Sequence, residues 1–69
     1  MSQTMNAARE HFHAKAAEAR VRLDLYSNNP LAVGDHSNVV DEVIKATEDY
    51  EHAVSCMEII QAVVKENAS

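Results

Sequence analysis

The chain has 69 residues, of which 46% are hydrophobic and 25% charged, with a single cysteine and a formal net charge of −5. A chain of this length forms one small domain, which usually needs a disulfide, a metal or a second subunit to be stable. Cys56 has no second cysteine to pair with, which indicates a reducing, cytosolic setting. An acidic chain repels phosphate backbones, so we expect no binding to nucleic acid.

The N-terminal segment gives no sign of export. Its first fifteen residues are polar, and no apolar run in the chain approaches the roughly 20 residues of a membrane span. The helical faces are acidic or mixed in charge, which disfavours adsorption to anionic lipid. We therefore expect a cytoplasmic protein without a membrane partner.

The first predicted element is a helix over about residues 4–27. Its apolar positions alternate in steps of four and three, which keeps their side chains on one face, as in a coiled-coil seam. The seam positions are Met5, Arg9, Phe12, Ala16, Ala19, Leu23 and Tyr26, and only the arginine is polar. On the exposed side, the pairs Glu18–Arg22 and Arg20–Asp24 are four residues apart, so we expect them to form ion pairs.

A connector over residues 28–37 follows this helix. Pro30 cannot continue a helix, and Gly34, the only glycine, lies in the same stretch. We expect the apolar residues Leu31 and Val33 to fold over the closed end of the structure.

The second predicted helix covers about residues 38–67. Ser37 or Asn38 is expected to cap it, with Asp41 and Glu42 in its first turn, where the helix dipole favours negative charge. The same alternating spacing defines a second seam: Val39, Val43, Ala46, Tyr50, Ala53, Met57, Ile60 and Val64.

The connector is long enough for the two helices to fold back on each other. In the register that opposes each large ring to an alanine, Phe12 faces Ala53 and Tyr50 faces Ala16. The remaining pairs in this register include Ala19–Ala46, Leu23–Val43 and Tyr26–Val39. The sequence thus predicts an all-α fold, an antiparallel two-helix hairpin that forms a single domain over residues 1–69.

A two-helix seam uses only part of the apolar surface. The spare positions are Ala14, Ala17, Val21 and Leu25 in the first helix and Val40, Val54, Ile59 and Val63 in the second. Exposed apolar patches of this kind mark interaction surfaces. We expect self-association into a homodimeric four-helix bundle, while tetramers, the order of the helices and other protein partners stay open.

Four polar residues support an alternative, a metal-binding bundle. Glu10 and His13 have the Glu-x-x-His spacing of di-iron bundles, and Asp49 and His52 repeat it with an aspartate. Both histidines flank the seam rather than point into it. Solvent-facing histidines are therefore the preferred interpretation, and we expect no metal and no cofactor.

Cys56 follows His52 by four residues, a spacing compatible with an imidazole–thiolate pair for zinc. Acidic neighbours such as Glu58 disfavour a reactive thiolate, so we expect a buried structural cysteine instead. The single glycine excludes a glycine-rich phosphate loop. These observations predict a protein that is not an enzyme.

The stretch Tyr26-Ser27-Asn28-Asn29-Pro30-Leu31-Ala32-Val33-Gly34-Asp35-His36, followed by an acidic helix, resembles short helical proteins encoded by tailed viruses of marine cyanobacteria. The resemblance implies a small accessory protein acting in an infected bacterial cytoplasm or carried by marine microbial DNA. It brings no activity and no functional residues. The predicted function is that of a small interaction, regulatory or assembly protein.

Overall fold

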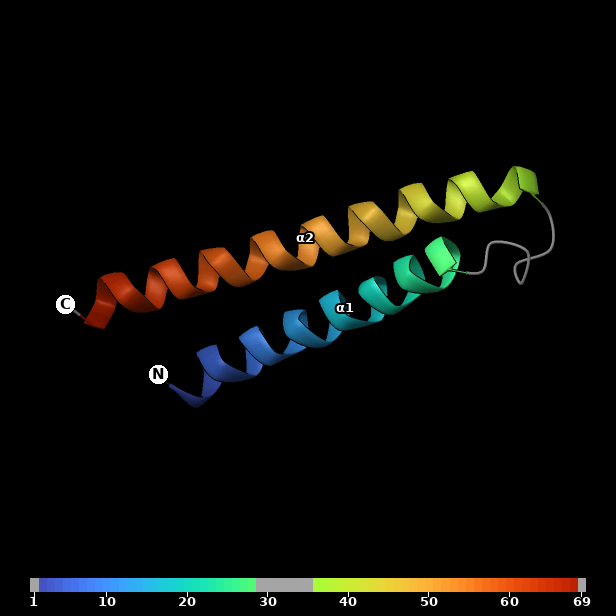
Figure 1. Cartoon of the computed structure of the whole chain (residues 1–69). Coiled ribbons are helices and arrows are strands. Elements are labelled where there is room, and N and C mark those ends of the chain that lie inside the picture. Colours follow the sequence, from blue (N-terminus) through green and yellow to red (C-terminus); the bar gives the residue numbers. More distant parts are fainter. Residues whose placement is uncertain (1, 29–35, 69) are drawn as a thin grey trace.

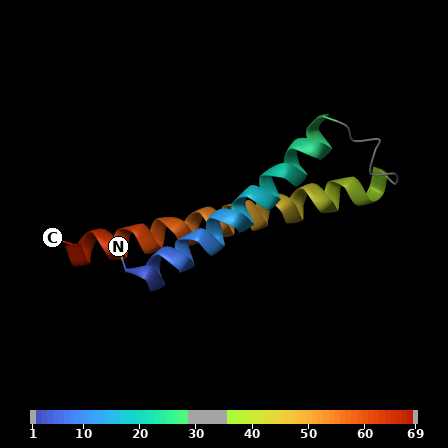
Figure 2. The ribbon, with the colours of Figure 1, turned by 90° about the horizontal axis from the view of Figure 1, so that it is seen from below.

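The computed structural model describes residues 2–28 and 36–68. It contains helix α1, Gln3–Asn28, and helix α2, His36–Ala68, of 26 and 33 residues. The helices lie side by side and run in opposite directions, so the two ends of the chain lie at the same end of the hairpin (Figure 1). Seen from below, α1 crosses α2 near the middle of the hairpin (Figure 2). The predicted all-α fold and the pairing of two helices are confirmed.

The start of α1 has a side-chain cap. The backbone N–H of Met5 donates a hydrogen bond of 3.1 Å to the Ser2 hydroxyl, which satisfies one of the free amides of the first turn. The helix begins one residue before the predicted start and ends one residue after the predicted end.

The predicted cap of α2 is wrong. The helix begins at His36, so Ser37 and Asn38 lie inside it, and its first turn holds no acidic residue. Serine and asparagine cost well under about 1 kcal/mol each in a helix, a cost that extra backbone hydrogen bonds offset. Asp41 and Glu42 therefore lie beyond the first turn. The predicted positions of Leu31 and Val33 fall outside the described residues.

The core of the hairpin is made of alanine. Among the described residues, the buried hydrophobic ones are Ala16, Ala19, Ala46 and Ala53, and none is more than 7% exposed. Because Ala19 and Ala46 are fully covered, the two backbones approach each other closely at that level. No large side chain of the described part is completely buried.

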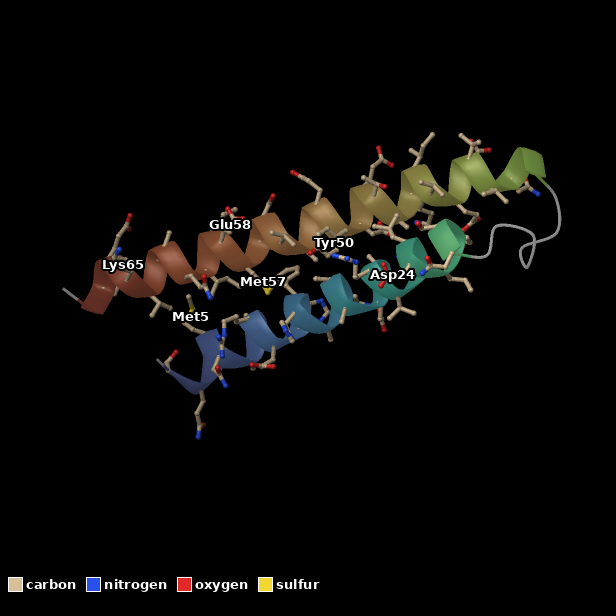
Figure 3. The ribbon with its side chains drawn as sticks, viewed as in Figure 1. Met5, Asp24, Tyr50, Met57, Glu58 and Lys65 are labelled. Carbon is tan, nitrogen blue, oxygen red and sulfur yellow. The ribbon has the colours of Figure 1, made fainter. Side chains whose placement is uncertain are left out.

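The larger seam residues are half-buried. They are Met5, Phe12, Leu23, Tyr26, Val39, Val43, Tyr50, Met57, Ile60 and Val64. Figure 3 shows Met5, Tyr50 and Met57 between the two helices. The predicted seam is confirmed, but a single hairpin covers its large side chains from one direction only.

Shared hollows support the predicted register. Phe12 and Ala53 line one hollow, Ala16 and Tyr50 a second, and Leu23 and Val43 a third. The hairpin extends 50 × 15 × 15 Å. Neither described helix is long and apolar enough to cross a membrane.

Candidate functional site

The seam divides the surface of the hairpin into two flanks. We call one the ion-paired flank, defined by His11, Lys15, Glu18, Arg22, Asp49 and His52. We call the other the groove flank, defined by His13, Ala17, Arg20, Tyr50, Val54 and Met57. Residues seven apart in a heptad pattern share a side of the helix, which extends each flank along the hairpin.

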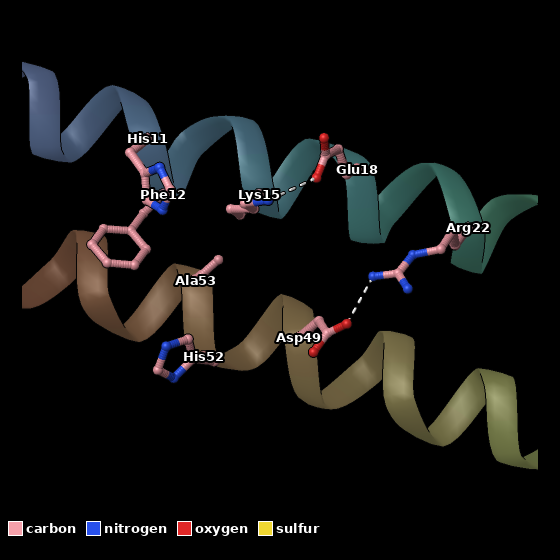
Figure 4. A pocket seen from close by; sticks show the side chains of 8 residues that line it. All are labelled: His11, Phe12, Lys15, Glu18, Arg22, Asp49, His52 and Ala53. Atoms are coloured by element: carbon pink, nitrogen blue, oxygen red, sulfur yellow. Dashed lines mark hydrogen bonds and ion pairs between the residues drawn. The ribbon is translucent and has the colours of Figure 1, made fainter.

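The ion-paired flank joins the two helices by charge. Arg22 of α1 donates a hydrogen bond of 2.9 Å to Asp49 of α2 (Figure 4). Lys45 lies 3.8 Å from the same carboxylate. Lys15 lies 3.7 Å from Glu18 in the same view. Arg22, Asp49, Lys15 and Glu18 line a hollow of about 340 Å³.

The Arg22 hydrogen bond also fixes the charge of Asp49. It lowers the pKa of this carboxyl below its usual 3.8, and nearby Lys45 acts in the same direction against the opposing effect of burial. Asp49 is therefore fully ionised at neutral pH. An anion held by two cations is a structural partner rather than a proton donor.

Aromatic rings form a second link across the helices on this flank. The Phe12 ring lies between two imidazoles, edge to face, with centroids 5.0 Å from His11 and 6.3 Å from His52. Such pairs add modestly to the burial of the phenyl ring. His11, His13 and His52 are all exposed, as predicted.

Tyr26 connects the two flanks. Its ring lines a hollow of the groove flank, and its hydroxyl donates a hydrogen bond of 3.3 Å to Glu42, which lies seven residues before Asp49. Burial raises the pKa of Tyr26, and the charge and hydrogen bond of Glu42 raise it further. The phenol therefore stays protonated, so neither Tyr26 nor Asp49 has the shift that would activate it as an acid or base near pH 7.

One of the two predicted ion pairs within α1 is confirmed. Arg20 lies 3.1 Å from Asp24, and this carboxylate raises the pKa of the guanidinium. The predicted Glu18–Arg22 pair is wrong, because Arg22 reaches across to α2 and Glu18 pairs with Lys15.

The groove flank holds three hollows that share lining residues. Arg20 and Tyr50 line both the first, of about 390 Å³, and the second, of about 260 Å³. His13 and Met57 line both the second and the third, of about 170 Å³. The shared residues make the three hollows one groove between α1 and α2, from Ser27 and Val43 at one end to Arg9 and Gln61 at the other.

Arg9 lies at the end of the groove and is the one polar seam residue. Its terminal nitrogen donates to Asn6 at 3.0 Å and Glu10 at 3.2 Å. Its Nε is buried and has no hydrogen-bond partner among the described residues. An unsatisfied buried donor is destabilising, so this end of the seam is less stable than an apolar side chain would make it.

The predicted interface residues are mostly exposed. Val21, Leu25, Val40, Ile59 and Val63 are among the exposed large hydrophobics, Ala14 and Ala17 are exposed, and Val54 is half-buried. Ile44 belongs to the same class, with 51% of its surface exposed, and sequence reasoning missed it. Its position one helical turn after Val40 was the available signal.

These apolar residues divide between the two flanks. Val40 and Thr47 precede Val54 by fourteen and seven residues, which places them on the groove flank of α2 with Ile44 beside them. Val63 follows Asp49 by fourteen residues, so it lies on the ion-paired flank, where Ile59 is its neighbour one turn away. The exposed apolar residues of α2 therefore do not form one continuous stripe along the helix.

The four residues of the metal-binding alternative do not share a hollow. Glu10 and His13 line the groove flank, whereas Asp49 and His52 line the ion-paired flank. Within residues 2–28 and 36–68, no three His, Cys, Asp or Glu side chains are grouped so that they could hold one metal ion. His13 and His52 therefore lie on opposite sides of the seam.

Cys56 differs from its prediction. Its Sγ lies 3.7 Å from Nε2 of His52, so the predicted proximity of thiol and imidazole exists. The cysteine is half-buried rather than buried, because one hairpin leaves this side of α2 uncovered. A thiol and one exposed imidazole supply two ligands, fewer than a zinc site requires.

Compared with known protein families, curated proteins and solved structures, the chain matches none of them. The resemblance of the connector to viral proteins stays a prediction, and most of that stretch lies outside the described residues.

Proposed function

We propose that this chain is a small binding or assembly protein rather than an enzyme, and that its working form is a homodimeric four-helix bundle. The observation that carries the proposal is the amount of uncovered surface. The hairpin exposes 5080 Å², whereas a compact monomer of 7.6 kDa exposes about 4,300 Å². The excess of roughly 800 Å² equals what each partner covers in a protein–protein interface of standard size.

The composition of that surface supports the same conclusion. Six large hydrophobic side chains of the described part are exposed, among them Val40 and Ile44 on the groove flank, with 62% and 51% of their surface in water. Burial of one such side chain is worth about 1.5–3 kcal/mol. A hairpin whose own core is four alanines gains more from a second layer of helices than from any internal contact.

The setting is part of the proposal. The lone cysteine favours a reducing compartment, and the resemblance of the connector favours the cytoplasm of a bacterial or virus-infected cell. There the bundle would act by presenting its outer helical surface to another protein.

Native mass spectrometry of the untagged protein tests the proposal and its metal-binding alternative together. We expect a species of twice the 7.6 kDa chain mass, with no added metal. A well-folded monomer at micromolar concentration would contradict self-association. Stoichiometric iron or zinc that is lost in His13→Ala or His52→Ala would support the metal-binding alternative instead.

A further inference from the structure

We propose that the groove flank is the surface covered by a second copy of this chain, with α1 of each copy against α2 of the other. The ion-paired flank then stays on the outside of the bundle. This inference rests on the proposed function, because it specifies the face through which the hairpins associate.

The two flanks differ in what association would remove from water. The groove flank presents Ala17, Val54 and the edges of Tyr50 and Met57, together with His13 and the Arg20–Asp24 ion pair, whose side chains are 63% and 57% exposed. The other flank presents the Arg22–Asp49 ion pair, with side chains 36% and 42% exposed. Covering the half-buried Arg22–Asp49 pair costs desolvation energy that its Coulomb attraction barely returns. Covering the groove buries mostly apolar surface, and the more exposed Arg20–Asp24 pair can stay in water at its rim.

The shape of the groove flank suits a long helical occupant. The groove runs between the helices through three connected hollows, and exposed Val40 and Ile44 continue the apolar surface at one end. The hairpin is 50 Å long and 15 Å wide, and a face of those dimensions matches the roughly 800 Å² that each partner covers in a standard interface. Small residues such as Ala17 permit close approach of another helix.

Charge selects a second copy as the occupant and sets its orientation. Helix α1 carries four cationic and three anionic side chains, whereas α2 carries two cationic and seven anionic ones. Packing like helices together would bring the two acidic α2 helices into contact. Packing α1 of one copy on α2 of the other sets a nearly neutral helix against an acidic one, which the charges favour. In that order all neighbouring helices are antiparallel, and the N-termini of both copies lie at the same end of the bundle.

Two matched pairs of variants test the choice of flank. Val40 and Ile59 are both 62% exposed on α2, but Val40 lies on the groove flank and Ile59 on the other. Ala17 and Ala14 are both exposed on α1, and only Ala17 is among the groove residues. The variants are Val40→Glu against Ile59→Glu, and Ala17→Glu against Ala14→Glu.

Sedimentation equilibrium gives the dimer dissociation constant, and circular dichroism on the same samples checks that the helices persist. We expect Val40→Glu and Ala17→Glu to raise the dissociation constant at least about tenfold, and the two controls to change it less than about twofold. Equal weakening within each pair, or stronger weakening by Ile59→Glu and Ala14→Glu, would overturn the choice of flank. A wild-type protein that is monomeric throughout would instead contradict the proposed function.

Spin labels test the order of the helices. A nitroxide on Gln3→Cys in a Cys56→Ser background reports the distance between the two N-terminal ends by double electron–electron resonance. We expect a distance below half the 50 Å length of the hairpin. A distance close to that length would place the ends at opposite ends of the bundle and overturn the arrangement of α1 on α2.

Discussion

On the ion-paired flank, Arg22 reaches Asp49 at 2.9 Å, whereas on the groove flank the same two helices leave hollows between Ala17 and Val54. The same heptad spacing places residues of both helices beside the seam on either flank, so the backbone does not by itself explain the difference. The difference lies in the side chains: on one flank charged side chains link the two helices across a hollow, and on the other the hollows have a largely apolar lining with no ion pair between the helices among the described residues. A hairpin of this kind has one flank whose helices are linked by charge and one whose groove we propose is covered by a further layer.

The largest effect on the free energy of unfolding should come from truncating Tyr50, which lines the groove. Tyr50 is half-buried and lines two of the three hollows. Tyr50→Ala should lower the free energy of unfolding by about 2 kcal/mol, less than a fully buried aromatic side chain because the ring is partly exposed. Urea unfolding at a fixed protein concentration measures the change. Tyr50→Phe keeps the ring, so an equally large loss in that variant would show that packing in the groove is not the cause.

A gain in stability is expected at the other end of the groove. Arg9→Leu removes the buried Nε that has no hydrogen-bond partner among the described residues, so it should raise the free energy of unfolding by about 1 kcal/mol. Lys15→Leu, on the exposed ion-paired flank, serves as the matched control and should give no comparable gain. If Arg9→Leu is destabilising in thermal and urea unfolding, the guanidinium contributes more through Asn6 and Glu10 than it costs.

The ion-paired flank should contribute less, and its contribution should depend on pH. The pKa of Asp49 is lower in the folded chain than its usual 3.8, so its stabilising effect is complete above that value. The effect is lost as the pH falls below about 4, through the lower pKa of the folded state. Asp49→Asn should therefore lower the melting temperature slightly at neutral pH and converge with the wild type in acid. A difference that persists unchanged at the lowest pH would argue against the Arg22 pair as its source.

The smallest expected effect on stability comes from the ionisation of Tyr26, which contacts both flanks. Its pKa is raised above the usual 10.0, so its contribution to stability is complete below pH 10 and is lost as the pH rises through the higher pKa of the folded state. Ultraviolet absorbance should show Tyr26 ionising at higher pH in the folded chain than in urea. Glu42→Gln should reduce the shift only in part, since burial is its largest cause. Complete removal of the shift by Glu42→Gln would contradict that order of causes.

The seam and its register were predictable because helical periodicity is a one-dimensional signal. Alternating steps of four and three identify the buried alanines and the half-buried residues around them, and these positions agree with the structure. The Arg20–Asp24 pair follows from its spacing in the same way. Features that depend only on spacing within one helix could therefore be predicted from the sequence.

The sequence was less informative about the flank of the seam on which a residue lies and about its partners on the other helix. The spacings that suggest a metal site do not reveal that His13 and His52 flank the seam on opposite sides. Arg22 was assigned to Glu18 because spacing within a helix does not reveal a partner on the other helix. The cap of α2 failed for a different reason, since several polar residues before a helix compete for that role at similar energy.

The measurement that tests the central claim most directly is sedimentation equilibrium of the untagged wild-type protein across low to high micromolar concentration, with circular dichroism on the same samples. We predict a strongly helical dimer throughout this range, because one hairpin exposes more surface than a compact chain of its mass, by about the area that each partner covers in a standard interface. A strongly helical monomer at high micromolar concentration would contradict the claim, since the exposed apolar residues would then be tolerated in water without a partner copy.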